Sequence, residues 1–83
     1  MAKILYFGPL ADMLHKESEQ LPLPADVTTI AELLGYLRKR GTDWALYLAD
    51  DKIQVTINRQ FSGVQNPISN TDEISLTSIR RRL

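Results

Sequence analysis

Cysteine is absent from this chain and histidine occurs only once, which excludes several kinds of functional site. Without cysteine there is no disulfide framework, no thiolate nucleophile and no cysteine-based metal site, and a single histidine excludes most metal-ligand clusters. Long apolar runs are also missing. The longest near the N-terminus is Ile4–Phe7. A membrane-spanning helix needs roughly 20 apolar residues, and the apolar core of a signal peptide needs at least about 7. We therefore expect a cytoplasmic protein without a membrane partner.

The chain also lacks an excess of charge of one sign, since ten Lys and Arg residues balance ten Asp and Glu residues. Three of the cations, Arg80, Arg81 and Arg82, lie in the last four positions, and without them seven cations face ten acidic residues, a net charge of −3. Nucleic-acid-binding domains are usually basic, so no nucleic acid is expected as a partner. A length of 83 residues supports one small core, and we predict a single domain over residues 1–83 with a short basic C-terminal tail.

The first predicted strand, Lys3–Phe7, is apolar on both of its faces. Successive side chains in a strand point to opposite sides, so Ile4 and Tyr6 share one face while Leu5 and Phe7 share the other. If a helix covers only one face, the other face keeps an exposed apolar patch. Such patches usually mark a partner surface.

The main helix is predicted from Ile30 to Arg40. Four apolar residues recur at helical spacing, and Thr29 with Glu32 fits a capping box in which each side chain bonds the backbone amide of the other residue. Gly41 is expected to end the helix in a left-handed conformation. Gly35 costs about 1 kcal/mol relative to alanine in a helix, and close packing is its expected explanation.

Shorter patterns complete the predicted fold. Prolines at 22 and 24 indicate that the second strand is an edge strand or ends early. The order of elements predicts an α+β fold in which a mixed sheet is covered on one face by one main helix. The other elements are expected as a short helix at 10–15, a strand at 18–23, a turn of helix at 42–48, and strands at 52–58, 60–62 and from 74 onward.

The ionisable residues do not converge on a site in the sequence. His15 has only Asp12 as a carboxylate neighbour at helical spacing, so a surface histidine is favoured over a general base. The acidic pairs Asp50-Asp51 and Asp72-Glu73 are typical of solvated turns, with a magnesium site as the alternative.

No other motif supplies chemistry. Gly8-Pro9 lacks the glycine pattern and the Lys-Ser/Thr pair of a phosphate-binding loop. Trp44 lies among apolar residues, which favours core packing over a ligand platform. We predict no catalytic residue, no metal and no cofactor, and no autonomous catalytic site.

Taken together, four segments resemble the small subunit of molybdopterin synthase: KILYFGPLADML, TIAELLGYLRKR, DWALYLADDKIQVTIN and NPISNTDEISL. That family has the ubiquitin-like β-grasp fold and is related to the thiamine-pathway sulfur carrier. The resemblance implies a sulfur carrier in molybdenum cofactor biosynthesis rather than a free-standing enzyme. It implies two partners: an adenylating enzyme that activates the terminal glycine, and a large subunit that receives the resulting thiocarboxylate.

The carboxyl end departs from the family's pattern. Family members end in Gly-Gly, which can thread through a narrow channel as extended backbone, whereas this sequence ends Arg81-Arg82-Leu83. Burying an unpaired guanidinium there costs on the order of several kcal/mol. The departure puts sulfur-carrier activity in question, with replaced glycines or a reading frame continuing past Leu83 as the two explanations. The alternative function is a diverged β-grasp binding or regulatory module without sulfur-transfer chemistry.

The partner surface implied by the resemblance is the sheet face opposite the helix, together with the tail. Phe7 and Phe61 match apolar positions of that surface, and Thr77 stands where family members often have an aromatic residue. For the three arginines, a solvated terminus is the alternative to binding acidic groups of a partner. The predicted partner-binding residues are Leu5, Phe7, Phe61, Arg80, Arg81, Arg82 and Leu83.

Overall fold

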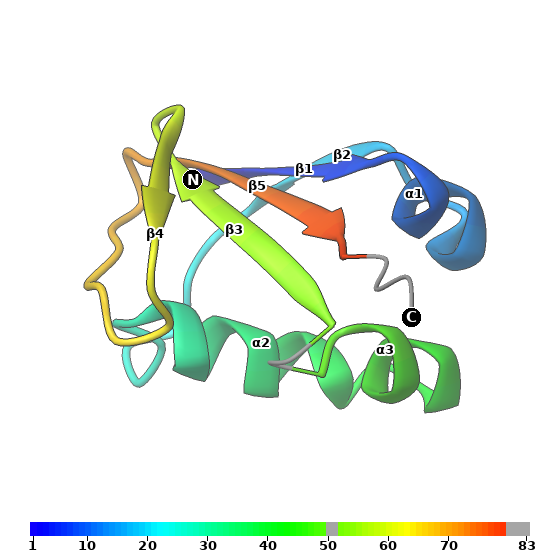
Figure 1. Cartoon of the computed structure of the whole chain (residues 1–83). Coiled ribbons are helices and arrows are strands. Elements are labelled where there is room, and N and C mark those ends of the chain that lie inside the picture. The colour runs from blue at the N-terminus through cyan, green and yellow to red at the C-terminus, as the bar shows by residue number, and fades with distance from the viewer. Residues whose placement is uncertain (50–51, 80–83) are drawn as a thin grey trace.

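In the computed structural model, which describes residues 1–49 and 52–79, five strands form one mixed sheet in the order β2-β1-β5-β3-β4 (Figure 1). The central strands β1 and β5 are parallel, and every other neighbouring pair is antiparallel. This arrangement confirms the predicted α+β fold with a mixed sheet. The elements are β1 (Ala2–Phe7), α1 (Pro9–Leu14), β2 (Ser18–Leu21), α2 (Ile30–Arg38), α3 (Thr42–Tyr47), β3 (Ile53–Ile57), β4 (Gln60–Ser62) and β5 (Glu73–Ser78).

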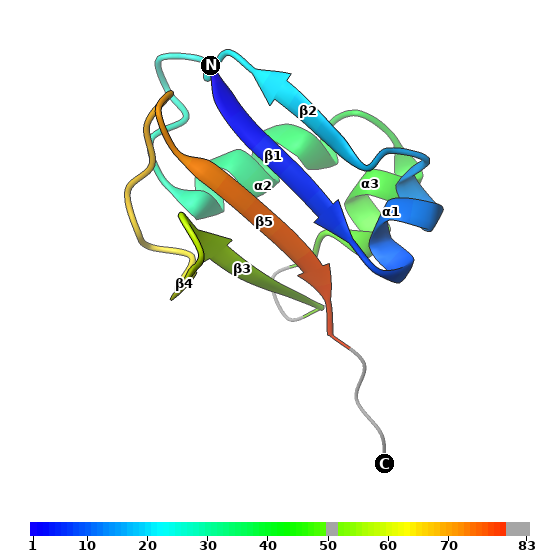
Figure 2. The same cartoon turned by 90° about the horizontal axis from the view of Figure 1, so that it is seen from above.

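The helices α2 and α3 lie against one face of the sheet (Figures 1 and 2). The buried apolar side chains of the helices and the strands form one core cluster between the two layers. The two faces of β1 separate as predicted: Ile4 and Tyr6 are buried on the helix side, while Phe7 on the other side is exposed. The other face of the sheet is turned toward the viewer in Figure 2, with α2 behind it. The side chains of the core that have no exposed area are Ala2, Ile4, Leu10, Ile30, Leu33, Leu34, Leu37, Leu48, Ile74 and Leu76.

The start of α2 forms the predicted capping box with one change of partner. The Glu32 amide donates to Thr29 Oγ1 at 3.2 Å, as expected. The Glu32 carboxylate, however, reaches one residue further back, where it accepts from the Thr28 amide at 2.9 Å and from Thr28 Oγ1 at 2.7 Å. These bonds hold the pKa of Glu32 below its usual value. The helix start is therefore stabilised by two threonines rather than one.

Two predictions about glycines near this helix are wrong. Gly41 does not end α2 in a left-handed conformation: its φ is 166°, which is extended backbone, and it precedes α3. The helix ends at Arg38, with Lys39 still in the right-handed region. Gly35 is not closely packed either, because a Cβ placed there would meet no atom within 4 Å.

A polar cluster joins the edge strand β2 to the segment that follows α2 and to α3. Tyr6 Oη donates to Glu19 Oε2 at 2.6 Å. The Arg40 guanidinium bonds both oxygens of Glu19, at 2.7 and 2.8 Å, and its carbon Cζ lies 4.8 Å from the centre of the Trp44 ring. Trp44 is half-buried, packs against the core as predicted, and meets the Tyr6 ring edge-on.

The cluster changes the protonation of its members. Burial, followed by the bond to Glu19, raises the pKa of the Tyr6 hydroxyl. Burial also raises the pKa of Glu19, but the hydrogen bonds from Arg40 and Tyr6 outweigh it, so the pKa of Glu19 lies below its usual value. Glu19 is therefore a carboxylate at neutral pH, held by a bidentate arginine.

Candidate partner-binding surface

The face of the sheet opposite α2, here called the open face, is assembled by strand register. Leu5 pairs with Ser18 and Ser75, Ser75 pairs with Thr56, and Thr56 pairs with Phe61. Paired residues in neighbouring strands point to the same side. These five residues therefore form one row across all five strands, with Leu5 near one edge and Phe61 at the other.

A second row runs parallel to the first, nearer the C-terminal end of β5. Phe7 pairs with Thr77, and Thr77 pairs with Gln54. The strand pairing continues one step further, since the Ile79 amide donates to the Lys52 carbonyl at 2.8 Å. Ile79 therefore extends the open face, and the alternation of β5 places it on the same side as Thr77.

Phe7 and Phe61 are exposed on the open face and strand register keeps them apart, whereas Leu5 is half-buried. The side chain of Phe7 is 48% exposed and that of Phe61 is 78% exposed. Three strand spacings separate Leu5 from Phe61, which is roughly 14 Å. The short hydroxyl side chains of Ser75 and Thr56 lie between them. The open face thus has two apolar contact points with small polar residues in the middle.

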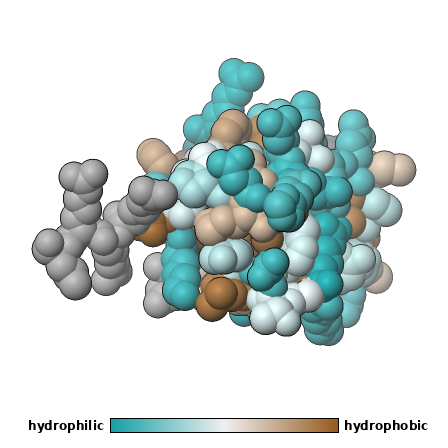
Figure 3. Space-filling view, turned by 90° about the vertical axis from the view of Figure 1, so that its right-hand side faces the viewer, coloured by the Kyte–Doolittle hydropathy of each residue, from teal (hydrophilic) through white to brown (hydrophobic). Residues whose placement is uncertain are grey.

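The end of the molecule that carries α1 and α3 has a more polar surface. Figure 3 shows hydrophilic side chains over most of this end, with apolar side chains in separate small areas. One hollow of about 520 Å³ lies between α1 and β2, and its lining residues include Asp12, His15 and Lys16. No aromatic residue lines it, and none of its ionisable groups is buried.

The predicted partner residues fall into two groups. The structure brings Leu5 and Phe7 together at one side of the open face and places Phe61 at the other. Arg80, Arg81, Arg82 and Leu83 lie outside the described residues. Ile79 was not singled out by sequence reasoning, although its phase in the last strand was the available signal.

The acidic turn at Asp72 has a structural task. Asp72 Oδ1 accepts from Asn58 Nδ2 at 2.9 Å, and its Oδ2 accepts from the Ser69 amide at 2.8 Å. The other half of the alternative magnesium site, Asp50-Asp51, lies outside the described residues. Over residues 1–49 and 52–79, no group of three or more metal-ligating side chains is brought together. In the same part of the chain, no helix is long and apolar enough to cross a membrane.

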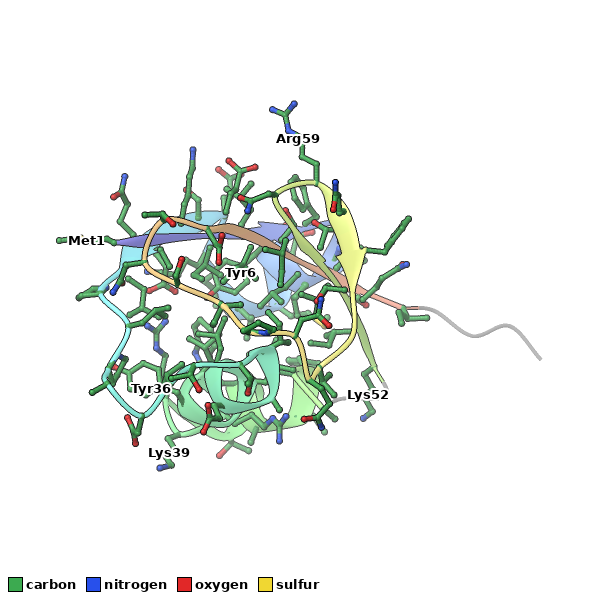
Figure 4. The ribbon with its side chains drawn as sticks, turned by 90° about the vertical axis from the view of Figure 1, so that its left-hand side faces the viewer. Met1, Tyr6, Tyr36, Lys39, Lys52 and Arg59 are labelled. Atoms are coloured by element: carbon green, nitrogen blue, oxygen red, sulfur yellow. The ribbon has the colours of Figure 1, made fainter. Side chains whose placement is uncertain are left out.

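The hairpin of β3 and β4 turns tightly at the edge of the open face. Asn58 and Arg59, which connect β3 to β4, have φ values of 51° and 71°. The asparagine amide donates to Asp72, and its Oδ1 accepts from the Glu73 amide at 2.9 Å. Figure 4 shows Arg59 projecting from the hairpin, away from Tyr36 of α2 and from Lys39, which follows that helix. Sequence reasoning did not identify Arg59, although the two-residue spacing between the strands was visible.

The comparison with known proteins agrees with this architecture. A family model described as the ThiS family matches residues 4–78. The chain belongs to the ThiS family. The match covers every strand apart from the first two residues of β1, so the family assignment applies to the whole sheet.

Individual relatives of this ThiS-family chain show how far the similarity extends. The molybdopterin synthase sulfur carrier subunit of Haemophilus influenzae is 28% identical over 75 residues, covering 90% of each chain. A protein of Pyrococcus furiosus assigned as molybdopterin converting factor, subunit 1, superposes with a TM-score of 0.76 at 15% identity, covering 93% of this chain and 94% of that one. SAMP1 of Haloferax volcanii gives a TM-score of 0.75 at 18% identity, covering 95% and 94%.

These findings confirm the resemblance to molybdopterin synthase small subunits and the ubiquitin-like β-grasp fold. Because their identities to the ThiS-family chain are only 15% and 18%, the two solved structures show the fold alone.

Proposed function

We propose that this chain is the small subunit of a molybdopterin-synthase-like complex and that it binds a larger protein subunit through the open face. The family match and the similarity to a molybdopterin synthase sulfur carrier subunit support this class of function. The single observation that supports a partner on this face is Phe61. Its side chain is 78% exposed although it belongs to the sheet. On the opposite face of the neighbouring strands, the apolar side chains of Val55, Ile74 and Leu76 are buried.

Burial of both exposed phenylalanine side chains in a partner would contribute favourably to the free energy of binding. Fully burying a phenylalanine side chain contributes about 1.5–3 kcal/mol, and aromatic anchors of this kind dominate the binding energy of many interfaces. The open face keeps Phe7 and Phe61 roughly 14 Å apart or more, so the partner would need an apolar pocket for each. The seryl and threonyl side chains between them are short enough to let the partner approach the sheet.

Binding to the molybdopterin synthase large subunit of the same organism tests this proposal. We expect the wild-type chain to bind, and the variants Phe7→Asp and Phe61→Asp to bind at least tenfold more weakly, because each places a charge in an apolar contact. Tyr36→Asp is the matched control, since Tyr36 is an exposed aromatic residue on the helix side of the molecule. Circular dichroism of each variant verifies that it is folded.

Two results would reject the proposal. One is a wild-type chain that does not bind the large subunit. The other is a Tyr36→Asp variant that weakens binding as much as Phe61→Asp, which would place the contact on the helix layer.

The sulfur-carrier step needs a separate experiment, because it depends on the residues Arg81-Arg82-Leu83 rather than on the open face. If Leu83 is the carboxyl terminus, the side chains of Arg82 and Leu83 would have to enter any channel shaped for glycine. The chain is incubated with an adenylating enzyme of the same organism, ATP and a sulfur donor, and its intact mass is measured. Replacement of one terminal oxygen by sulfur would identify a carrier. An unchanged mass with retained binding would favour a binding module without sulfur chemistry.

A further inference from the structure

Arg59 is an exposed cation at the edge of the open face, two residues before Phe61. It occupies the second position of the two-residue turn between the paired residues Ile57 and Gln60. Positive φ at both central residues is the signature of a type I′ hairpin turn, in which glycine is the favoured residue at the second position. Arginine at this position therefore works against the stability of the turn.

The two turn residues differ in what holds them. Asn58 is a residue that tolerates the left-handed conformation, and its side chain makes hydrogen bonds to Asp72 and Glu73. Within the part of the chain that the structure describes, the Arg59 guanidinium makes no hydrogen bond, ion pair or ring contact. No internal interaction of the described fold accounts for an arginine here.

We infer that Arg59 is a specificity-determining contact for the partner, pairing with a carboxylate that lies beside the pocket for Phe61. This inference rests on the proposed function. The Arg59 side chain points away from the helix layer, toward the side from which a partner on the open face would approach (Figure 4). An arginine fork can bond both oxygens of a carboxylate, which adds geometric selectivity to the apolar contact of Phe61.

The charge of the rest of the chain favours a protein carboxylate over a polyanion as the counterpart. Residues 1–79 have seven cations and ten acidic side chains, a net charge of −3. A domain of that charge repels nucleic acid. A single carboxylate in a mostly neutral protein interface, by contrast, needs only one cation opposite it, and Arg59 supplies that cation. The contact is expected to affect the rate of association as well as its selectivity.

The test uses the large subunit of molybdopterin synthase from the same organism as the probe. Arg59→Gly is expected to bind about tenfold more weakly, the loss that corresponds to one charge-assisted hydrogen bond. Arg59→Glu should bind more weakly still, and Arg59→Lys should recover part of the affinity. The matched control is Lys39→Glu, an exposed cation on the helix layer (Figure 4), which should bind within twofold of wild type. The wild-type affinity should fall more steeply with salt than that of Arg59→Gly.

A stability measurement separates this role from a structural one. Because glycine suits the turn, Arg59→Gly should unfold at the same temperature as wild type or a higher one. A lower unfolding temperature would overturn the inference. So would binding of Arg59→Gly within threefold of wild type, or an equal loss in Lys39→Glu. If the wild-type chain does not bind the probe, the proposed function fails and this inference falls with it; if only the Arg59 variants are unaffected, the proposed function stands.

Discussion

At the scale of single residues, backbone conformation and residue type disagree at several positions. His15 has a φ of 56° and closes α1, with the Lys16 amide returning to the Ala11 carbonyl at 3.1 Å. Glycine is the usual residue in such a helix stop. Gly35, by contrast, lies inside a helix, where it is unfavourable. Its neighbourhood is a hollow of about 230 Å³ lined by residues that include Val27 and Tyr36.

We expect Gly35→Ala to raise the free energy of unfolding by about 0.5–1 kcal/mol, because the new Cβ meets no atom and alanine is the better helix former. The measurement is denaturant unfolding of the wild-type and variant proteins.

Gly8→Ala is the control for this substitution. Gly8 has a φ of 60°, a conformation that a side chain opposes even though space is available around it. This variant should lose about 1 kcal/mol or more. A Gly35→Ala variant that is destabilised as much as Gly8→Ala would contradict the open surroundings of Gly35.

At the scale of elements, the cluster of Tyr6, Glu19 and Arg40 ties the paired strands β1 and β2 to the segment between α2 and α3. Glu19 lies on the edge strand β2, while Arg40 follows α2 and stacks on Trp44 of α3. Only 12% of the Glu19 side chain is exposed. A charged pair with so little exposure contributes more than a surface salt bridge, provided that its hydrogen bonds are satisfied.

The pKa of Glu19 predicts how stability depends on pH. A carboxyl whose pKa is lowered by folding stabilises the protein above its ordinary pKa, and the contribution is lost as pH falls through the folded value. We expect wild-type stability to drop more between about pH 5 and pH 3 than that of Glu19→Gln. At pH 7 the variant should be less stable by about 1–2 kcal/mol. The measurement is thermal unfolding across this range.

Arg40→Gln provides the control for the partner charge. This variant should also show a weaker pH dependence of stability, because the hydrogen bond from Arg40 is the largest of the effects that lower the pKa of Glu19. Identical pH profiles for wild type and Glu19→Gln would show that the pair does not couple to folding.

Elements with a local signal were the ones that the sequence predicted best. The stripe from Ile30 to Leu37 and the cap at Thr29 identified α2, because helical contacts join residues only three or four apart. The end of that helix was predicted two residues too late. Its stop depends on the turn into α3, which brings Trp44 against Arg40.

At the scale of the whole molecule, the chain is a two-layer domain with α2 and α3 on one side of the sheet (Figure 1). The exposed side chains of Phe7 and Phe61 belong to the other side. The two faces should respond differently to substitution. Ile4→Ala removes a fully buried side chain and should cost about 2–5 kcal/mol of stability. Phe61→Asp should change the free energy of unfolding by no more than about 0.5 kcal/mol, because that side chain is mostly in water. Denaturant unfolding of both variants measures the contrast, and a strongly destabilised Phe61→Asp would mean that this side chain packs within the monomer.

The amino-acid sequence by itself determined the element types, which side chains of β1 share a face, and the kinship with sulfur-carrier subunits. Each of these depends on local periodicity or on residues that match in order. Only the tertiary structure decided that Leu5, Ser75, Thr56 and Phe61 stand in one row, or that Arg59 points outward from a left-handed turn. The physical reason is that strand register links residues up to about seventy positions apart. It does so through backbone hydrogen bonds, which every residue type except proline can make, so the sequence carries little local signal for the pairing. Local patterns predict which side of a strand is apolar, whereas the neighbours across the sheet determine what surface those side chains make.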